Sequence, residues 1–286
     1  MRAGGRVATG AISFRWTMLQ FETHGPVTRV EMSTPRSRLV GISVSMYLLD
    51  GVLIDTGFPD VRRDVGAWLD RLKPRGAIVT HAHEDHAGNV NSIAKRGIPL
   101  TIAEETLAAV RDVTPVGFYR HFTWSDMRPL RYEITPFDPA PFEFVHLPGH
   151  STDHHVVWHP ERRILFGGDL YLGVKVRVSH PGEQVRVLVD SLRAAARLEP
   201  ELFFDAHRGL VDDPVRMLHA KADWLEQTIG EIDRLADAGW SDAAIRRAVL
   251  GREDATGYFS FGDYSRANFV RAVRATRPSL LTTARS

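Results

Sequence analysis

The feature that most constrains this chain is the segment 80–89, which reads Thr-His-Ala-His-Glu-Asp-His-Ala-Gly-Asn. It places three histidines and one aspartate, at His81, His83, Asp85 and His86, within six positions. Histidines at alternate positions of an extended loop can point their rings the same way. The aspartate and the third histidine follow at the start of a turn or helix and can face an adjacent point. The spacing favours a metal site for two neighbouring ions over a polar loop that is merely rich in histidine.

Four polar loops follow four short apolar segments that we expect to be strands. Layered α/β proteins usually carry their ligand sites where strands end. The histidine cluster follows the strand expected at 77–79, and one candidate ligand follows each of the other three strands: His150 after 142–147, Asp169 after 164–166, and His207 after 202–204.

The composition limits the chemistry of such a site. The chain has no cysteine among its 286 residues, so disulfides are excluded and any metal must be held by nitrogen and oxygen ligands. The absence of cysteine also fits a cytoplasmic protein. Lysine and arginine number 36 against 35 aspartates and glutamates, which gives no electrostatic reason to expect nucleic-acid or membrane-surface binding. No apolar run approaches the roughly 18 residues of a membrane span.

Short strands and helices alternate up to residue 213 and predict a layered α/β core, after which the pattern becomes entirely helical. The expected strands are 19–23, 27–32, 40–49, 52–54, 77–79, 98–102, 142–147, 156–158, 164–166 and 202–204. The expected helices are 59–72, 91–96, 104–112, 184–198, 215–238, 241–250 and 264–276. We therefore predict three parts: a poorly ordered N-terminal extension at 1–18, an α/β domain at 19–213, and a helical C-terminal extension at 214–286.

The segment 114–141 interrupts this alternation. It contains five prolines and six aromatic residues and shows no clear periodicity. Long segments of this kind inside a compact domain are more often functional than idle. We consider two interpretations equally: a lid over the site, and a satellite hydrophobic cluster that packs on the sheet.

Taken together, these motifs resemble the metallo-β-lactamase superfamily, with matching residues from about Leu19 to Gly209. Its signature, His-x-His-x-Asp-His, stands at 81–86, and its later ligands stand as His150 in Leu-Pro-Gly-His-Ser, Asp169 in Gly-Gly-Asp, and His207. Asp55, in Asp-Thr-Gly, resembles the strand-end aspartate of that family. One position departs: many members read Gly-His-Gly around the last histidine, whereas this chain reads Ala-His-Arg-Gly at 206–209.

The resemblance implies a four-layer αββα sandwich of two mixed β-sheets flanked by helices, followed here by the helical C-terminal extension. It also implies that Asp55 supports the ligand shell without binding metal. Five imidazoles and two carboxylates suit two zinc ions, with iron or manganese also compatible. The implied ligands form two sets joined by one carboxylate: His81, His83 and His150 for one ion, Asp85, His86 and His207 for the other, and Asp169 bridging both.

The activity that this resemblance implies is that of a metal-dependent hydrolase, closest to glyoxalase-II-like enzymes. A hydroxide that bridges the two metals would attack the carbonyl of an ester, thioester or lactone, with Asp85 and Asp169 as the catalytic carboxylates. Two alternatives within the same fold stay open: a mono-iron dioxygenase acting on a thiol or persulfide, and an RNA-cleaving phosphodiesterase. The complete set of second-metal ligands favours the hydrolase.

Further residues are candidates for the pocket or for a partner. Either His154 or His155, close behind His150, is placed to reach the site. The C-terminal helices are a candidate homodimer contact. Three residues beyond the bridging aspartate are candidates to bind an anionic part of a small-molecule substrate, with a solvated strand edge as the alternative: Tyr171, Lys175 and Arg177.

Overall fold

The computed structural model describes residues 18–276, so nearly all of the predicted N-terminal extension lies outside the described residues. The described chain divides into two compact units, and each is considered by itself. The first unit comprises residues 18–113 and 123–139, and the second comprises 114–122 and 140–276. Residues 140–213 group with the C-terminal helices in this division, and the predicted domain boundary at 213/214 stays a prediction.

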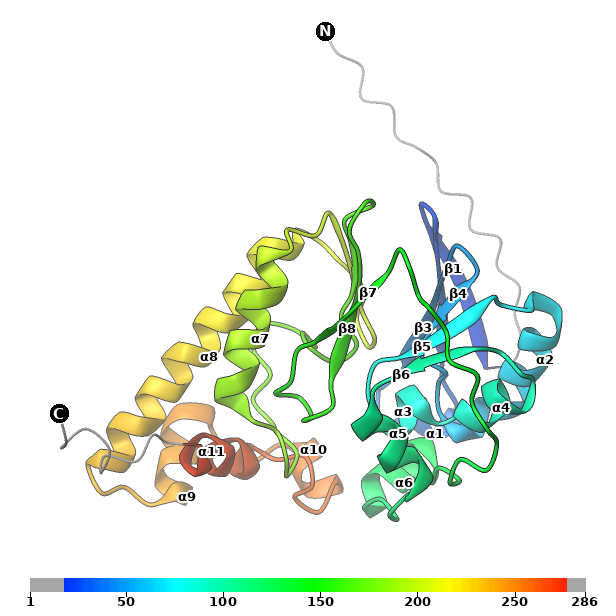
Figure 1. Ribbon diagram of the computed structural model, residues 1–286. Helices are drawn as coiled ribbons and strands as arrows, with labels where there is room; N and C mark the ends of the chain where they lie inside the picture. The colour runs from blue at the N-terminus through cyan, green and yellow to red at the C-terminus, as the bar shows by residue number, and fades with distance from the viewer. Residues whose placement is uncertain (1–17, 277–286) are drawn as a thin grey trace, which may run out of the picture. The chain divides into compact units, whose positions relative to one another are not determined.

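The first unit is built on a six-stranded mixed sheet (Figure 1). Its strands lie in chain order: β1 (Leu19–His24), β2 (Val27–Met32), β3 (Val44–Leu49), β4 (Val52–Ile54), β5 (Gly76–Val79) and β6 (Leu100–Ile102). The first four pair antiparallel, and β4, β5 and β6 pair parallel. The tight turn from β3 to β4 has positive φ at both Asp50 and Gly51, as a two-residue hairpin turn requires.

Helices cover this sheet and connect its strands. They are α1 (Pro35–Leu39), a 3₁₀ turn η1 (Pro59–Val61), α2 (Arg62–Leu72), α3 (Glu84–Ala87), α4 (Val90–Lys95) and α5 (Glu104–Arg111). The strand expected at 40–49 begins only at Val44, and the short helix α1 before it was not predicted. The signal for α1 is local: Thr34 and Ser37 form a reciprocal capping box, and Pro35 occupies its first turn.

The second unit is built on a five-stranded mixed sheet of order β11-β10-β9-β8-β7. The strands are β7 (Glu143–His146), β8 (His155–His159), β9 (Ile164–Phe166), β10 (Leu202–Asp205) and β11 (Gly209–Val211). Only β9 and β10 pair parallel. Consequently β7, β9 and β10 all end at the same edge of the sheet, where β8 begins.

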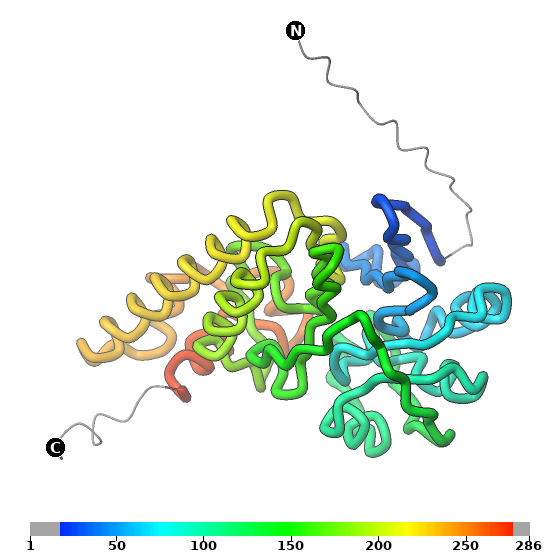
Figure 2. The backbone as a smooth tube through the Cα atoms, turned by 45° about the horizontal axis from the view of Figure 1, so that its top comes forward, coloured from blue at the N-terminus to red at the C-terminus, as the bar shows by residue number. Residues whose placement is uncertain are grey.

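Helices from both sides of residue 214 complete the second unit. They are α7 (Val185–Arg197), α8 (Pro214–Asp237), α9 (Asp242–Ile245), the short η2 (Arg246–Leu250), α10 (Ala255–Phe259) and α11 (Arg266–Ala275). Helices α7 and α8 run side by side (Figures 1 and 2). Leu192 of α7, Phe203 of β10 and Leu218 of α8 are fully buried in one hydrophobic core. The C-terminal helices therefore share the core of the second sheet.

The proline-rich segment 114–141 packs largely through its aromatic side chains. It contains α6 (Phe118–Trp124), at which the chain passes from the second unit to the first. Tyr119 is 5.7 Å from the ring of Phe259, and Trp124 is 4.7 Å from the ring of Phe58, between centroids. This is the packing expected of a satellite hydrophobic cluster, and a role as a lid stays a prediction. No helix among residues 18–276 is long and apolar enough to cross a membrane.

Candidate metal centre

The first unit gathers the predicted ligands of the histidine cluster at the carboxyl end of β5. The strand ends at Val79, and α3 begins at Glu84, so the cluster occupies the loop and the first helical turn. Ligand atoms of His81 and His83 lie within 4.8 Å of one another, as do those of Asp85 and His86. The rings of His81 and His86 are fully buried, with centroids 4.1 Å apart.

Polar groups at the ends of β4 and β5 hold these imidazoles in place. Nδ1 of His86 donates to Oδ2 of Asp55 over 2.8 Å, and Nδ1 of His81 lies 3.0 Å from the Thr80 hydroxyl. Asp55 is itself fixed, because its Oδ1 accepts the Thr80 backbone N–H at 2.8 Å. Carboxylate or hydroxyl partners on the distal ring nitrogen are typical of metal-binding histidines. The arrangement directs Nε2 of His86 away from Asp55, where it is available to a metal.

The second unit gathers the remaining three predicted ligands at one sheet edge. His150 follows β7, Asp169 follows β9, and His207 follows β10. Nε2 of His150 is 3.3 Å from Oδ2 of Asp169, and Nε2 of His207 is 3.4 Å from Oδ1 of the same carboxylate. Two ligands of a tetrahedral ion, each about 2.0–2.1 Å from it, stand about 3.3 Å apart. The donor set thus fits a carboxylate that shares one oxygen with each of two metal sites.

Glu183 orients His150, and the sequence analysis did not identify it. Nδ1 of His150 donates to Oε1 of Glu183 over 3.1 Å, and the Ser179 hydroxyl donates to the other carboxylate oxygen. Burial raises the pKa of the Glu183 carboxyl group, but the hydrogen bonds from His150 and Ser179 lower it, and the net shift is downward. Glu183 lies 33 residues from His150 in the sequence and belongs to no motif, so only the fold reveals the contact.

A close approach of backbone fixes the loop that carries His150. Gly149 has φ +129°, and a Cβ there would lie 2.5 Å from the Leu188 Cα of α7. Only glycine satisfies both conditions. The carbonyl of Gly149 also accepts the N–H of Gln184 at 2.7 Å, which joins the loop to the start of α7.

His154 is the member of the 154–155 pair that reaches the candidate site. Its Nδ1 donates to the Leu147 carbonyl at 3.0 Å, and its Nε2 accepts the backbone N–H of Asp169 at 3.1 Å. The side chain is fully buried, and these two partners define its tautomer. His155 instead stacks on Phe144, with ring centroids 4.1 Å apart.

Asp205 shapes the loop that carries His207. Its side chain is fully buried and accepts three backbone N–H groups, from Leu172 at 2.7 Å, His207 at 2.9 Å and Arg208 at 2.7 Å. Burial and the nearby charge of Asp169 raise the pKa of the Asp205 carboxyl group. Arg208, at the position that departs from the family motif, donates from Nε to the Leu172 carbonyl at 3.0 Å. It ties the His207 loop to the loop that follows Asp169.

A buried lysine from α8 supports the same loop. Nζ of Lys221 donates to the Leu170 carbonyl at 3.0 Å and also to the Tyr171 carbonyl. Burial lowers the pKa of Lys221 to about 8. The first of the C-terminal helices therefore positions the backbone directly after Asp169.

The three predicted substrate contacts occupy different environments. Tyr171 is 7% exposed, and its ring packs against Phe203 with centroids 5.8 Å apart. Burial raises the pKa of its phenol group. Lys175 and Arg177 are exposed in the loop that follows. Their role in substrate binding stays a prediction, and the buried ring of Tyr171 favours a packing role for that residue.

The motifs and the fold are those of a known superfamily. A family model described as Metallo-beta-lactamase superfamily matches residues 40–207, and the chain belongs to that superfamily. The chain is 29% identical over 215 residues to "Beta-lactamase-like protein 2 homolog" of Drosophila melanogaster, covering 66% of this chain and 68% of that protein. It is 27% identical over 172 residues to "Atrochrysone carboxyl ACP thioesterase dmxR1" of a Cryptosporiopsis species, covering 54% and 49% respectively.

Solved structures show the same fold. A metallo-beta-lactamase family protein from Thermus thermophilus aligns with a TM-score of 0.60 at 16% sequence identity, covering 88% of this chain and 94% of that one. The α/β sandwich fold predicted from the sequence is confirmed by this likeness and by the two mixed, helix-flanked sheets. Superfamily membership suggests a metal-dependent hydrolase, although some members of the superfamily have other activities.

Proposed function

We propose that this protein is a dinuclear metal-dependent hydrolase that cleaves an ester, thioester or lactone. The observation that carries the proposal is Asp169, which has a histidine Nε2 at 3.3 Å from one carboxylate oxygen and another at 3.4 Å from the other. The family model extends over all seven candidate ligands, from 81 to 207. A relative described as a thioesterase supports an acyl substrate.

The seven ligands would hold two divalent ions, for which zinc suits the imidazole and carboxylate donors best. Bound metals of this kind activate water near neutral pH and polarise a carbonyl group. In the proposed arrangement His81, His83 and His150 serve one ion, Asp85, His86 and His207 serve the other, and Asp169 serves both.

The protein's own residues would fix this geometry. Asp55 and Glu183 accept hydrogen bonds from Nδ1 of His86 and His150, which keeps both Nε2 atoms available to metal. Nε2 of His154 accepts the backbone N–H of Asp169 and so holds that backbone in place. We assign Asp85 and Asp169 the catalytic role of orienting the attacking water, because their carboxylates lie in the proposed ligand set.

The test combines metal analysis with turnover. Purified protein should contain two metal equivalents and hydrolyse one class within a panel of thioesters, esters and lactones. Asp169→Ala should lose at least one equivalent together with activity, whereas Asp190→Ala, at an exposed carboxylate on α7, should retain both. Turnover by metal-free protein would contradict the proposal. Oxygen uptake with a thiol substrate would also contradict it, in favour of the dioxygenase alternative.

A further inference from the structure

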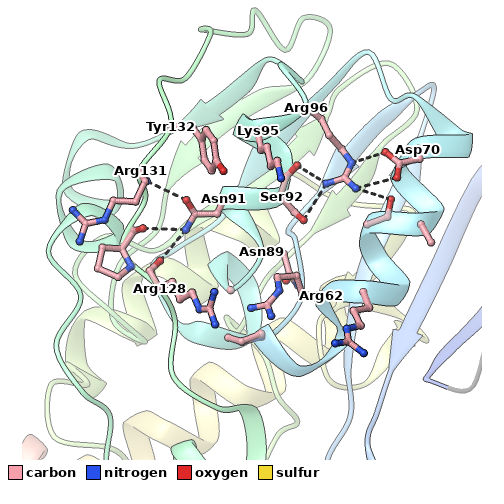
Figure 3. A pocket seen from close by; sticks show the side chains of 16 residues that line it. Arg62, Asp70, Asn89, Asn91, Ser92, Lys95, Arg96, Arg128, Arg131 and Tyr132 are labelled. Atoms are coloured by element: carbon pink, nitrogen blue, oxygen red, sulfur yellow. Dashed lines mark hydrogen bonds and ion pairs between the residues drawn. The ribbon is translucent and has the colours of Figure 1, made fainter.

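The first unit contains a pocket that is lined by none of the seven candidate ligands. It has a volume of about 630 Å³ and lies between α2, α4 and the segment 128–132 (Figure 3). That volume is within the usual range of small-molecule sites. Asn89, three residues beyond His86, contributes to its lining.

The pocket is strongly basic, although the whole chain has a net charge of only +1. Asp70 is its one acidic lining residue, and Arg96 neutralises it through hydrogen bonds of 2.7 and 3.1 Å. The hydrogen bonding from Arg96 lowers the pKa of the Asp70 carboxyl group. Five further cations line the pocket: Arg62, Arg63, Lys95, Arg128 and Arg131.

These five cations have no carboxylate partner within residues 18–276, and all five line the same pocket. Like charges in one pocket repel each other, and an anion would relieve that repulsion. Arginine side chains present a planar fork of donors that matches phosphate oxygens. The charge pattern therefore favours a ligand with several adjacent phosphates over one with a single negative charge.

The segment 128–132, which carries Arg128 and Arg131, is anchored by hydrogen bonds. Nδ2 of Asn91 donates to the carbonyls of Arg128 at 2.9 Å and Pro129 at 3.1 Å, and Oδ1 of Asn91 accepts the N–H of Arg131 at 3.0 Å (Figure 3). The N–H of Leu130 donates to the Val110 carbonyl at 2.8 Å, and the Leu130 side chain is buried. The two arginines are thereby presented to the pocket by an anchored backbone.

An aromatic ring lies beside these charges. Tyr132 is 42% exposed and lines the pocket next to Arg131 (Figure 3). Exposed aromatic rings beside phosphate-binding cations are suited to stacking against a nucleobase. We propose that this pocket binds a nucleoside di- or triphosphate, with the phosphates on the arginines and the base on Tyr132. The proposed site contains none of the seven candidate metal ligands.

Calorimetric titration of the purified full-length protein with ATP, ADP, inorganic pyrophosphate and inorganic phosphate tests this proposal. Affinity should rise with the number of adjacent phosphates, and ATP should bind more tightly than pyrophosphate. The double variant Arg128→Ala, Arg131→Ala should weaken ATP binding at least tenfold, and Tyr132→Ala should weaken ATP but not pyrophosphate. Arg111→Ala removes an exposed arginine on α5 outside the pocket and should leave both affinities within twofold.

Phosphates can also bind metals, so the same titrations are repeated on Asp169→Ala protein. If Asp169→Ala protein retains its ATP affinity, the result supports binding in the pocket. If that variant loses ATP binding, the phosphates bind at the metal centre and the proposal is overturned. Equal weakening by Arg111→Ala and by the double variant would indicate a general attraction for polyanions and overturn it as well. Tighter binding of a short RNA than of ATP would overturn the choice of a small ligand.

Discussion

Asp55 accepts a hydrogen bond of 2.8 Å from Nδ1 of His86, and the same carboxylate accepts the Thr80 backbone N–H at 2.8 Å. Asp55 follows β4 and His86 lies beyond β5, so this contact joins the ends of two neighbouring parallel strands. It relies on both carboxylate oxygens, because Oδ2 faces the imidazole and Oδ1 faces Thr80.

The variant Asp55→Asn should weaken metal binding without unfolding the protein. An asparagine has one acceptor oxygen, so it can satisfy either Thr80 or His86 but not both. Loss of such a contact typically costs about 10–100-fold in metal affinity. Competition with a chromophoric chelator measures this affinity, and Asp190→Asn on the surface of α7 is the matched control. Unchanged affinity in Asp55→Asn would show that the contact does not tune the metal site.

His154 offers a second test, because its neighbour His155 provides a control of the same residue type. The variant His154→Ala removes the acceptor for the Asp169 N–H and the donor to the Leu147 carbonyl. We expect at least a tenfold loss in kcat, because the backbone N–H of Asp169 loses the acceptor that positions it. His155→Ala should retain activity close to wild type. Equal effects on kcat from the two variants would show that His154 does not position Asp169.

The seven candidate metal ligands were predictable because they belong to short local sequence motifs. The signature 81–86 and the strand ends before His150, Asp169 and His207 identified residues that the fold brings together within each unit. The first candidate ligand after each of these strands lies two to four residues beyond the strand's end, so the strand pattern locates it. Strand pairing then brings these strand ends together. For example, Ile54 of β4 pairs with Ile78 of β5, which places Asp55 close to Thr80.

Other features depend on contacts that local sequence does not encode. Glu183 reaches His150 from the loop before α7, and Lys221 reaches the Leu170 carbonyl from α8 across 51 residues. The grouping of the C-terminal helices with the second sheet has the same origin, since it rests on a shared core. The pocket between α2, α4 and 128–132 was also missed, because its arginines are scattered along the sequence and the net charge conceals them.

Lys221 should make stability depend on pH in the alkaline range. Burial lowers its pKa from 10.5 to about 8, and the neighbouring carboxylates of Glu183, Asp205 and Asp169 only partly oppose the shift. Between about pH 8 and 10.5 the unfolded chain holds a proton that the folded chain has lost. The free energy of unfolding should therefore rise with pH in that window, by at most about 3 kcal/mol.

Denaturant unfolding of wild type and Lys221→Met across pH 7–10.5 isolates this contribution as a difference between the two proteins. The wild type should gain stability relative to the variant as pH rises, because methionine does not titrate. A difference that stays constant with pH would mean that Lys221 keeps an ordinary pKa in the folded protein.

Leu218 tests whether α8 belongs to the core of the second unit. The side chain is fully buried in the same hydrophobic cluster as Leu192 of α7 and Phe203 of β10. Leu218→Ala removes buried methyl groups and leaves a cavity, so it should lower the free energy of unfolding by about 3 kcal/mol. Leu39→Ala, at a side chain 79% exposed on α1, is the control and should change it by less than about 0.5 kcal/mol. If α8 were instead a loosely attached extension, Leu218→Ala would lower the stability of that helix alone, and the main unfolding transition would coincide with that of wild type.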